Sequence, residues 1–215
     1  MDRLLRKKWK LMENEFFYSL QRNLQTASDE TALISSALAG DLESFNSLAL
    51  AYQNLIYNVA FRILGERFSA EDAAQEAFIL AFRKLNSFRG GSFRSWLLRI
   101  VTNVCYDELR RLKRHPTSSL ELQGDMGEEI ESPKWITDPG ELPEESLERV
   151  ELARTIQACI DELPLEYRLV VVLVDIQGMD YAETAEILSL PLGTVKSRLA
   201  RARAKLSVYL RGNLI

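Results

Sequence analysis

The chain has 215 residues, of which 47% are hydrophobic, so it is long enough for one large or two small packed domains, and wholesale disorder is excluded. No apolar run approaches the roughly 18 residues that a membrane-spanning helix needs, and no apolar signal-peptide stretch follows the basic N-terminus. The single histidine gives no basis for a His-based metal centre or catalytic triad, and both cysteines fall in helical apolar patterns typical of reduced core thiols. We therefore expect a cytoplasmic protein without membrane insertion, metal or cofactor.

Charge is distributed unevenly along the chain. The net charge is −4, yet residues 83–114 contain nine basic side chains and only two acidic ones. Residues 194–215 contain six basic side chains and no acid, and an acidic stretch from Glu121 to Glu148 lies between the two basic segments. Because local patches set the field that a phosphate backbone meets, this distribution favours a nucleic-acid partner despite the negative total.

Hydrophobic spacing predicts an all-α fold, since apolar residues recur at helical periods and no convincing period-two strand pattern occurs. Residues 1–28 are expected to form a basic N-terminal extension, and residues 29–115 a first small helical domain. Three helices are expected in this domain: one from the cap Asp41 to Gly65, one from Ser69 with Asp72 as its capping partner, and one from the cap Ser92 to about Arg114.

An acidic linker is expected over residues 116–145, where Pro, Gly, Ser and acidic residues dominate. Whether Trp135 and Ile136 of this linker dock onto a domain stays open. Residues 146–212 are expected to form a second small helical domain, with helices at about residues 146–163, 166–177, 181–188 and 191–210. The predicted architecture is therefore two small helical domains joined by an acidic linker.

The last two predicted helices have the spacing of a helix-turn-helix, whose second helix enters the major groove of DNA. Asp180 and Glu183 form an N-terminal capping pair, and Pro191 suits a first helical position. Backbone amides near residues 192–194 are expected to be free to bind a phosphate. Outward positions of the final helix suit base edges and phosphates: Lys196, Ser197, Arg198, Arg201, Arg203 and Lys205. The alternative, a basic solvated helix, is disfavoured because no acid follows Glu186 to pair with these cations.

Two helix faces of the first domain carry candidate contacts. One face recurs at i, i+3, i+4, i+7: Asp72, Gln75, Glu76 and Ile79. It suits docking against a basic partner helix, and an ordinary solvated face is an equally good interpretation. The third helix has a stripe beside its core positions, just downstream of Phe88, Arg89 and Phe93: Trp96, Arg99, Asn103, Tyr106 and Arg110. Rings stack on unpaired bases and cations follow phosphates, so this stripe predicts a single-stranded DNA interface, although Phe93 and Trp96 taken singly suit core packing.

Two segments resemble one known family. The runs AEDAAQEAF at 70–78 and NSFRGGSFRSWLLRIVTNVCYDELRR at 86–111 resemble region 2 of the sigma-70 family. The run LPLEYRLVVVLVDIQGMDYAETAEILSLPLGTVKSRLARARAKL at 163–206 resembles region 4 of its extracytoplasmic-function (ECF) group. The resemblance implies an alternative sigma factor, not an enzyme, that binds core RNA polymerase, recognises and melts promoter DNA, initiates transcription and is held inactive by an anti-sigma factor.

The resemblance also implies roles for individual residues. A coiled coil of the largest polymerase subunit would be contacted by Asp72, Gln75, Glu76 and Ile79. The minus-ten element would be bound as a single strand by Phe88, Arg89, Gly90, Ser92, Trp96, Arg99, Asn103 and Arg110. The minus-thirty-five element would be read by Tyr181, Pro191, Gly193, Thr194, Lys196, Ser197, Arg198, Arg201 and Arg203. The acidic linker would run through the polymerase near its active site and RNA exit path.

The chain departs from the family pattern at four positions, which leaves the promoter sequence open. Thr184 stands where a larger aliphatic residue is usual, Ser189 where glycine is common, and Val174 where an arginine is frequent; Ala200 is smaller than in some relatives. Two other classes were weighed from the residues. One is a two-domain helix-turn-helix regulator that acts on duplex DNA without polymerase docking. The other is a nucleic-acid-processing enzyme, for which no phosphate-binding loop, metal cluster or activated nucleophile is visible.

Overall fold

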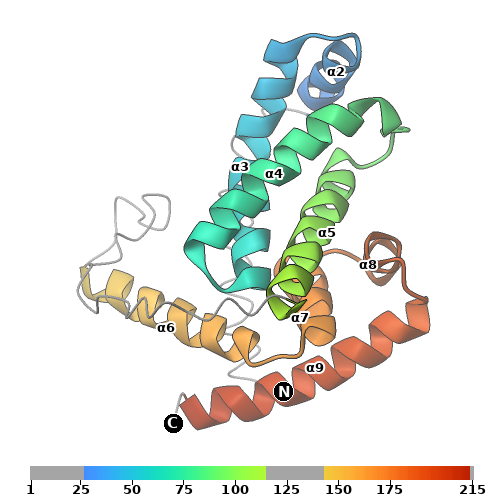
Figure 1. Cartoon of the computed structure of the whole chain (residues 1–215). Helices are drawn as coiled ribbons and strands as arrows, with labels where there is room; N and C mark the ends of the chain where they lie inside the picture. Colours follow the sequence, from blue (N-terminus) through green and yellow to red (C-terminus); the bar gives the residue numbers. More distant parts are fainter. Residues whose placement is uncertain (1–26, 115–142, 214–215) are drawn as a thin grey trace.

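The structure is a computed structural model that describes residues 27–114, here called the first unit, and 143–213, the second unit. The expected linker contacts of Trp135 and Ile136 lie outside the described residues. The helices run in the order α2 (Ala27–Leu38), α3 (Leu42–Leu64), α4 (Arg67–Lys84), α5 (Phe93–Arg114), α6 (Pro143–Asp161), α7 (Leu165–Val171), α8 (Tyr181–Leu188) and α9 (Leu192–Asn213). No strand occurs in these two ranges, which confirms the predicted all-α fold. Figure 1 shows α3, α4 and α5 as an upright bundle, with α6 and α9 crossing below it.

Local signals set the ends of α3 as predicted. The Asp41 carboxylate accepts from the backbone amides of Glu43 and Ser44, at 3.2 and 3.3 Å. Such a cap satisfies amides that have no partner within the helix. At the other end, Gly65 takes a left-handed conformation (φ 78°) that only glycine adopts without strain, and α3 stops there.

The start of α4 differs from the prediction. The helix begins at Arg67, because the Glu66 carboxylate accepts from the amides of Phe68 and Ser69 at 2.8 and 2.6 Å. Ser69 is therefore inside the first turn, and the predicted capping box with Asp72 is wrong. Glutamate caps helices less often than serine does. The prediction therefore placed the start of the helix at Ser69 and not at Glu66. In the structure, Asp72 is left on the exposed face of α4.

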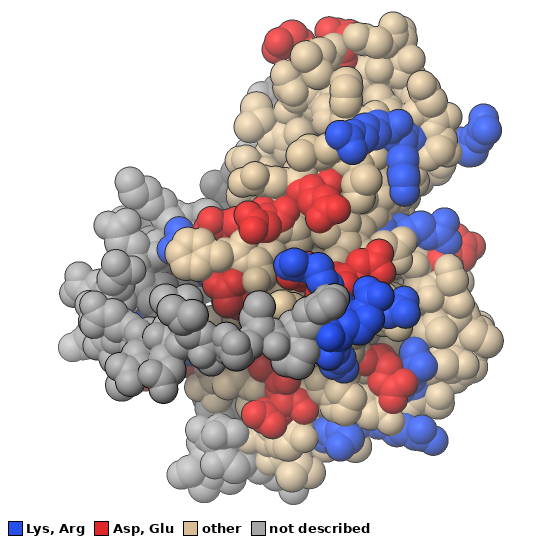
Figure 2. Space-filling model, viewed as in Figure 1, with Lys and Arg blue, Asp and Glu red and all other residues tan. Residues whose placement is uncertain are grey.

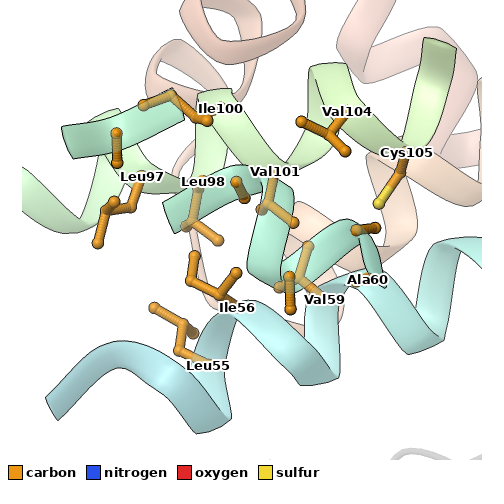
Figure 3. Packing of buried hydrophobic residues seen from close by; sticks show 14 of the residues in the cluster. Leu55, Ile56, Val59, Ala60, Leu97, Leu98, Ile100, Val101, Val104 and Cys105 are labelled. Carbon is orange, nitrogen blue, oxygen red and sulfur yellow. The ribbon is translucent and has the colours of Figure 1, made fainter. Parts of the chain in front are cut away.

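The core of the first unit joins α3, α4 and α5. Figure 3 shows Leu55, Ile56 and Val59 of α3 facing Leu98 and Val101 of α5, and all five are at most 1% exposed. The buried side of α4 consists of small side chains at positions 70, 73, 74, 77 and 81, all alanines. Short side chains let the helices approach closely, and the larger Phe78 and Leu80 of α4 pack against this core at partly buried positions.

The second unit is built around a continuous apolar segment. After α7 the chain widens into one π-helical turn, Val172–Ile176, which the sequence pattern did not predict. Then α8 begins with the predicted capping box, since Asp180 accepts from the Glu183 amide and Glu183 accepts from the Asp180 amide. The final helix, α9, packs against α7 and α6 through a row of buried aliphatic residues.

The two units pack against each other. Five apolar residues of the second unit belong to the same buried cluster as the core of the first: Leu169, Val172, Leu173, Met179 and Ile187. Figure 1 shows α7 and α8 lying beside the lower part of α5. The sequence predicted two domains joined by an acidic linker, and no short-range pattern in it predicted contacts between segments about 80 residues apart. Within the described ranges, no helix has the length and apolar character needed to span a membrane.

Candidate polymerase and nucleic-acid interfaces

The predicted docking face of α4 lies on the surface. Asp72, Gln75, Glu76 and Ile79 are all exposed, and Ile79 leaves 52% of its surface in water. Helical spacing aligns them, because residues three and four apart share one face, while the alanines of the opposite face enter the core. Figure 2 shows acidic side chains gathered in a band across the middle of the molecule. The arrangement can accept a basic partner helix with one apolar contact, Ile79, at the C-terminal end of the face.

Three aromatic rings meet where the chain enters α5. The ring centroids of Phe88, Phe93 and Trp96 lie 5.4–5.6 Å apart in each pair. Phe93 is only 3% exposed and also meets Tyr52 at 5.7 Å, so it belongs to the core. Phe88 and Trp96 are half-buried, packed on one side with the rest of their surface accessible. A base could stack on this pair only at its solvent side.

The loop before α5 needs its glycines for backbone conformation. Gly90 and Gly91 have φ values of 89° and 86°, which side chains with a Cβ rarely adopt. A Cβ at either position would meet nothing within 4 Å, so space is not the constraint. Ser92 then caps α5 as predicted, accepting from the Ser95 amide at 3.1 Å. The exposed Arg89 is thus carried on a turn fixed by glycine and ended by a cap.

The predicted stripe on α5 is a surface stripe. Arg99, Asn103, Tyr106 and Arg110 are exposed, and the Arg110 guanidinium lies 5.7 Å from the centroid of the Tyr106 ring. This distance is that of a cation–π contact. Arg99 donates a hydrogen bond to the backbone carbonyl of Glu186 in α8. One predicted DNA-binding cation is therefore engaged by the second unit.

The helix-turn-helix contains two departures from the family pattern, Ser189 in the turn and Thr184 within α8. Ser189 has φ 52°, the only non-glycine residue with positive φ among those described, so the frequent glycine would relieve strain there. Thr184 is fully buried, and its hydroxyl donates to the Asp180 carbonyl at 2.8 Å. A polar side chain is tolerated in this helix crossing because its hydroxyl has a partner.

The outward cations of α9 divide into two groups. Lys196 and Arg201 are exposed, with Ser197 beside them. Arg198 instead pairs with Glu166 at 3.0 Å, and Arg203 pairs with Asp175 of the π-helical turn through two hydrogen bonds, one of 3.0 Å from Nε. The latter bonds raise the pKa of Arg203, with Tyr181 of α8 contributing. Arg198 and Arg203 thus also tie α9 to its own unit.

The start of α9 differs in one respect from the prediction. Pro191, Leu192 and Gly193 are exposed, and a Cβ at Gly193 would meet nothing within 4 Å. The Thr194 amide, however, donates to the Pro191 carbonyl at 2.9 Å. The prediction that this amide is free to bind a phosphate is therefore wrong. The first turn of the helix closes with a tighter bond of the 3-10 type.

Comparison with known proteins identifies both units. The family model described as sigma-70 region 2 matches residues 48–115, and the one described as sigma-70, region 4 matches residues 153–206. The ECF RNA polymerase sigma factor SigW of Bacillus subtilis is 39% identical over 83% of this chain and 95% of its own length. The chain belongs to the ECF group of the sigma-70 family. The ECF RNA polymerase sigma-E factor of Escherichia coli is 34% identical to this sigma factor, over 81% of the chain and 90% of its own length.

Solved structures similar to this sigma factor are complexes. CnrH, in complex with the cytosolic domain of CnrY, aligns with a TM-score of 0.61 and 26% identity over 86% of this chain and 98% of CnrH. The sigma factor RpoE of Bartonella quintana, in complex with the anti-sigma factor NepR, aligns with a TM-score of 0.59 and 26% identity, over 79% of this chain and 98% of its own.

Several polar residues that organise the sigma factor escaped prediction. Asp175 is 8% exposed within the apolar run of region 4, and a lone acid in such a run was the signal that could have pointed to its arginine partner. Arg62, Arg94 and Arg168 hold region 2 to region 4. Nothing local in the sequence distinguishes these arginines from solvated ones, because their partners lie 80 or more residues away.

Both cysteines of the sigma factor are buried and neither is in a disulfide, which agrees with the predicted reduced core thiols. Burial raises the pKa of Cys105 to about 12, so its thiol stays protonated at neutral pH. Within the described ranges, no group of three or more His, Cys, Asp and Glu side chains is placed to hold a metal ion.

Proposed function

We propose that this chain is an alternative sigma subunit that binds core RNA polymerase through α4 and directs it to promoters. Region 2 binds the minus-ten element as a single strand along α5, and region 4 reads the minus-thirty-five element with α9. The observation that carries the proposal is that one chain combines three exposed faces: an acidic stripe on α4, an aromatic and cationic stripe on α5, and a polar N-terminal half of α9. Its family membership supports each role.

Polymerase docking supplies free energy for opening the DNA that the contacts to the single strand do not provide. Opening about ten base pairs costs on the order of 14 kcal/mol, at about 1.4 kcal/mol per step. Stacking two captured bases returns roughly 2–6 kcal/mol. Region 2 alone is therefore unable to open DNA, and a partner must provide the remainder. This difference favours a polymerase subunit over a regulator that acts on duplex DNA alone.

The minus-ten interface is proposed to use Phe88 and Trp96 as the stacking pair, because both keep accessible surface beside exposed cations. Asn103 lies on the same stripe and offers amide groups to a base edge. In region 4, Lys196 and Arg201 are proposed to read bases or bind phosphates, since neither is assigned to an ion pair within the described residues. The main proposed role of Arg203 is to hold α9 in place through its ion pair with Asp175.

The proposal extends to partners and location. One similar solved structure contains the anti-sigma factor NepR bound to the sigma factor RpoE, so we expect an anti-sigma factor to bind this chain too. A polymerase subunit acts where the polymerase is, in the cytoplasm. The chain itself is proposed to be non-catalytic, since its role is to position the polymerase on DNA.

Co-purification with core polymerase tests the proposal. The double reversal Asp72→Arg with Glu76→Arg should lower binding at least tenfold, because it replaces two acids of the α4 face with cations. The matched control Glu43→Arg with Glu151→Arg makes the same charge change at exposed sites on α3 and α6 and should bind like the wild type. Absence of wild-type binding, or equal binding by both double variants, would contradict the proposed function.

A further inference from the structure

The exposed face of α4 begins one turn before Asp72. Helical spacing places Phe68 on the same side of the helix as Asp72 and Ile79, and 74% of the surface of Phe68 is in water. No other large hydrophobic side chain of the described residues is as exposed. Between the two apolar ends, Asp72 and Glu76 form no ion pair within the described ranges. A segment that covers this face must therefore bring both apolar side chains and cations.

The segment at the start of the chain has the complementary composition. Residues 1–12 lie outside the described part of the chain and contain five basic side chains and one acidic one. Four of the cations recur at i, i+3, i+4 and i+7: Arg3, Arg6, Lys7 and Lys10. Leu4 and Leu11 are three and four residues from Lys7, so at helical spacing they share its side. The sequence of this segment thus offers cations bordered by apolar residues, as the α4 face requires.

The chain that precedes α2 leaves the described structure close to the start of α4. Tyr52 of α3 donates to the Glu30 carboxylate of α2 at 2.6 Å. Since a short turn joins the end of α2 to the start of α3, the two helices run antiparallel, and the start of α2 points toward the end of α3. Burial raises the pKa of Tyr57, about 8 Å further along α3, and the charges of Arg67 and Glu71 in the first turns of α4 also act on that pKa.

The reach of the segment is sufficient. Residues 13–26, between the basic segment and α2, span at most about 46–50 Å when extended. The α4 face from Phe68 to Ile79 is about 17 Å long, and a helix with its side chains is about 10–12 Å wide. Residues 3–12 can therefore lie along any part of the α4 face without a change in the described structure.

We infer that the α4 face from Phe68 to Ile79 binds residues 3–12 of its own chain, and that this segment competes there with core polymerase. The competition rests on the proposed function, whereas the contact itself does not. Asp72 and Glu76 attract a basic helix of the polymerase and the basic N-terminal segment for the same reason, and the face has room for one of them at a time. A second copy of the chain carries the same segment, so the experiments separate contact within a chain from contact between chains.

A tether makes even a weak contact effective. A short flexible linker gives the two ends an effective concentration on the order of 1 mM. A contact with a Kd of about 0.1 mM is then formed in roughly 90% of the chains, and it lowers the apparent affinity for polymerase roughly tenfold. Because attraction between exposed charges is screened within about 10 Å at 0.1 M salt, we expect the competition to decrease as the salt concentration rises.

Photo-crosslinking of the full chain tests the contact without polymerase. Trp9 is replaced by the photoreactive residue benzoylphenylalanine, and crosslinked peptides are mapped by mass spectrometry. The main crosslink should fall on α4 of the same chain, with a yield that does not depend on protein concentration. Asp72→Arg with Glu76→Arg should lower the yield at least fivefold, and the control Glu43→Arg with Glu151→Arg should not.

The apolar part of the contact has its own matched pair of variants. Phe68→Ser should lower the crosslinking yield at least twofold, because it removes the apolar end of the face nearest to the start of α2. Leu50→Ser removes a side chain of α3 that is 62% exposed and lies outside the α4 face, and it should leave the yield unchanged.

The affinity for core polymerase tests the competition. Lys7→Glu with Lys10→Glu should bind at least threefold more tightly than the wild type at about 50 mM salt, with a smaller difference at about 0.5 M. Lys113→Glu with Arg154→Glu makes the same charge change at exposed sites of α5 and α6 and should bind like the wild type.

Crosslinks that map away from α4, or that join only different chains, would overturn the inferred contact. Equal affinity of the wild type and Lys7→Glu with Lys10→Glu would overturn the competition, and so would weaker binding by that variant, which would place the segment on the polymerase. A chain that binds no polymerase in any form would contradict the proposed function and with it the competition, while the crosslink would still report the contact.

Discussion

The ion pair between Asp175 and Arg203 allows a test of how region 4 holds its reading helix. Asp175 lies in the π-helical turn with a side chain only 10% exposed, whereas the Arg203 side chain is 43% exposed. Water can therefore replace the partner of Arg203 but not that of Asp175. We expect Arg203→Met, which keeps most of the apolar stem, to cost about 2–3 kcal/mol of unfolding free energy, because it leaves a buried carboxylate without its cation. Asp175→Asn should cost about 1 kcal/mol, since the freed arginine is solvated.

The double variant distinguishes this account from two independent effects. With both charges gone, no buried charge is left unpaired, so Asp175→Asn with Arg203→Met should cost less than Arg203→Met alone, with a coupling of at least about 1 kcal/mol. Urea unfolding followed by circular dichroism measures all four proteins, with a constant slope against urea as the control for unchanged unfolded states. A coupling below about 0.5 kcal/mol, or a larger loss from Asp175→Asn than from Arg203→Met, would refute the reasoning.

Three further predictions concern region 4 and the core. Lys196→Ala or Arg201→Ala should each weaken minus-thirty-five binding by about 1–3 kcal/mol on a cognate site only if it reads a base; equal weakening on every sequence, with the salt slope reduced by about one, marks a phosphate contact instead. Ser189→Gly should raise the unfolding free energy by about 0.5 kcal/mol by relieving the positive φ, whereas Ser207→Gly inside α9 should lower it by about as much; equal signs in thermal melts would contradict this account. Because burial raises the pKa of Cys105 to about 12, its unfolded form loses the thiol proton first as pH rises past about 9. The stability advantage of wild type over Cys105→Ala should then shrink by about 1.4 kcal/mol per pH unit above that value, and a constant difference between pH 8 and 10.5 would show that the thiol is not buried.

Much of the local structure could be predicted because its causes are local. Asp41, Gly65, Ser92 and the Asp180–Glu183 pair act on amides and carbonyls within four residues, so their patterns were sufficient to place helix ends. The exception is Glu66, which caps α4 in a role more often taken by serine. The aligned residues of α4 and α5 followed in the same way from helical periodicity, which decides which side chains share a face.

The residues of each candidate site were predicted from the sequence. The residues that they contact within the chain were not. Periodicity placed Arg99, Arg198 and Arg203 outward, but it does not distinguish a cation facing water from one facing another helix. In the structure each of the three meets a group of region 4: Glu186, Glu166 or Asp175. Such contacts depend on how helices are arranged in space, and they change which cations are available to DNA.

The sequence by itself determined the helices other than α2, the two units, the family and the faces that carry charge and rings, because each of these follows from residue types at short spacing. Only the tertiary structure decided that region 4 packs on region 2, that Arg94 joins them, and that Asp175 anchors α9. The physical reason is that a contact between residues 28 to 105 positions apart leaves no periodic trace in either segment. It depends on the shape and polarity of two surfaces that exist only after their helices have formed.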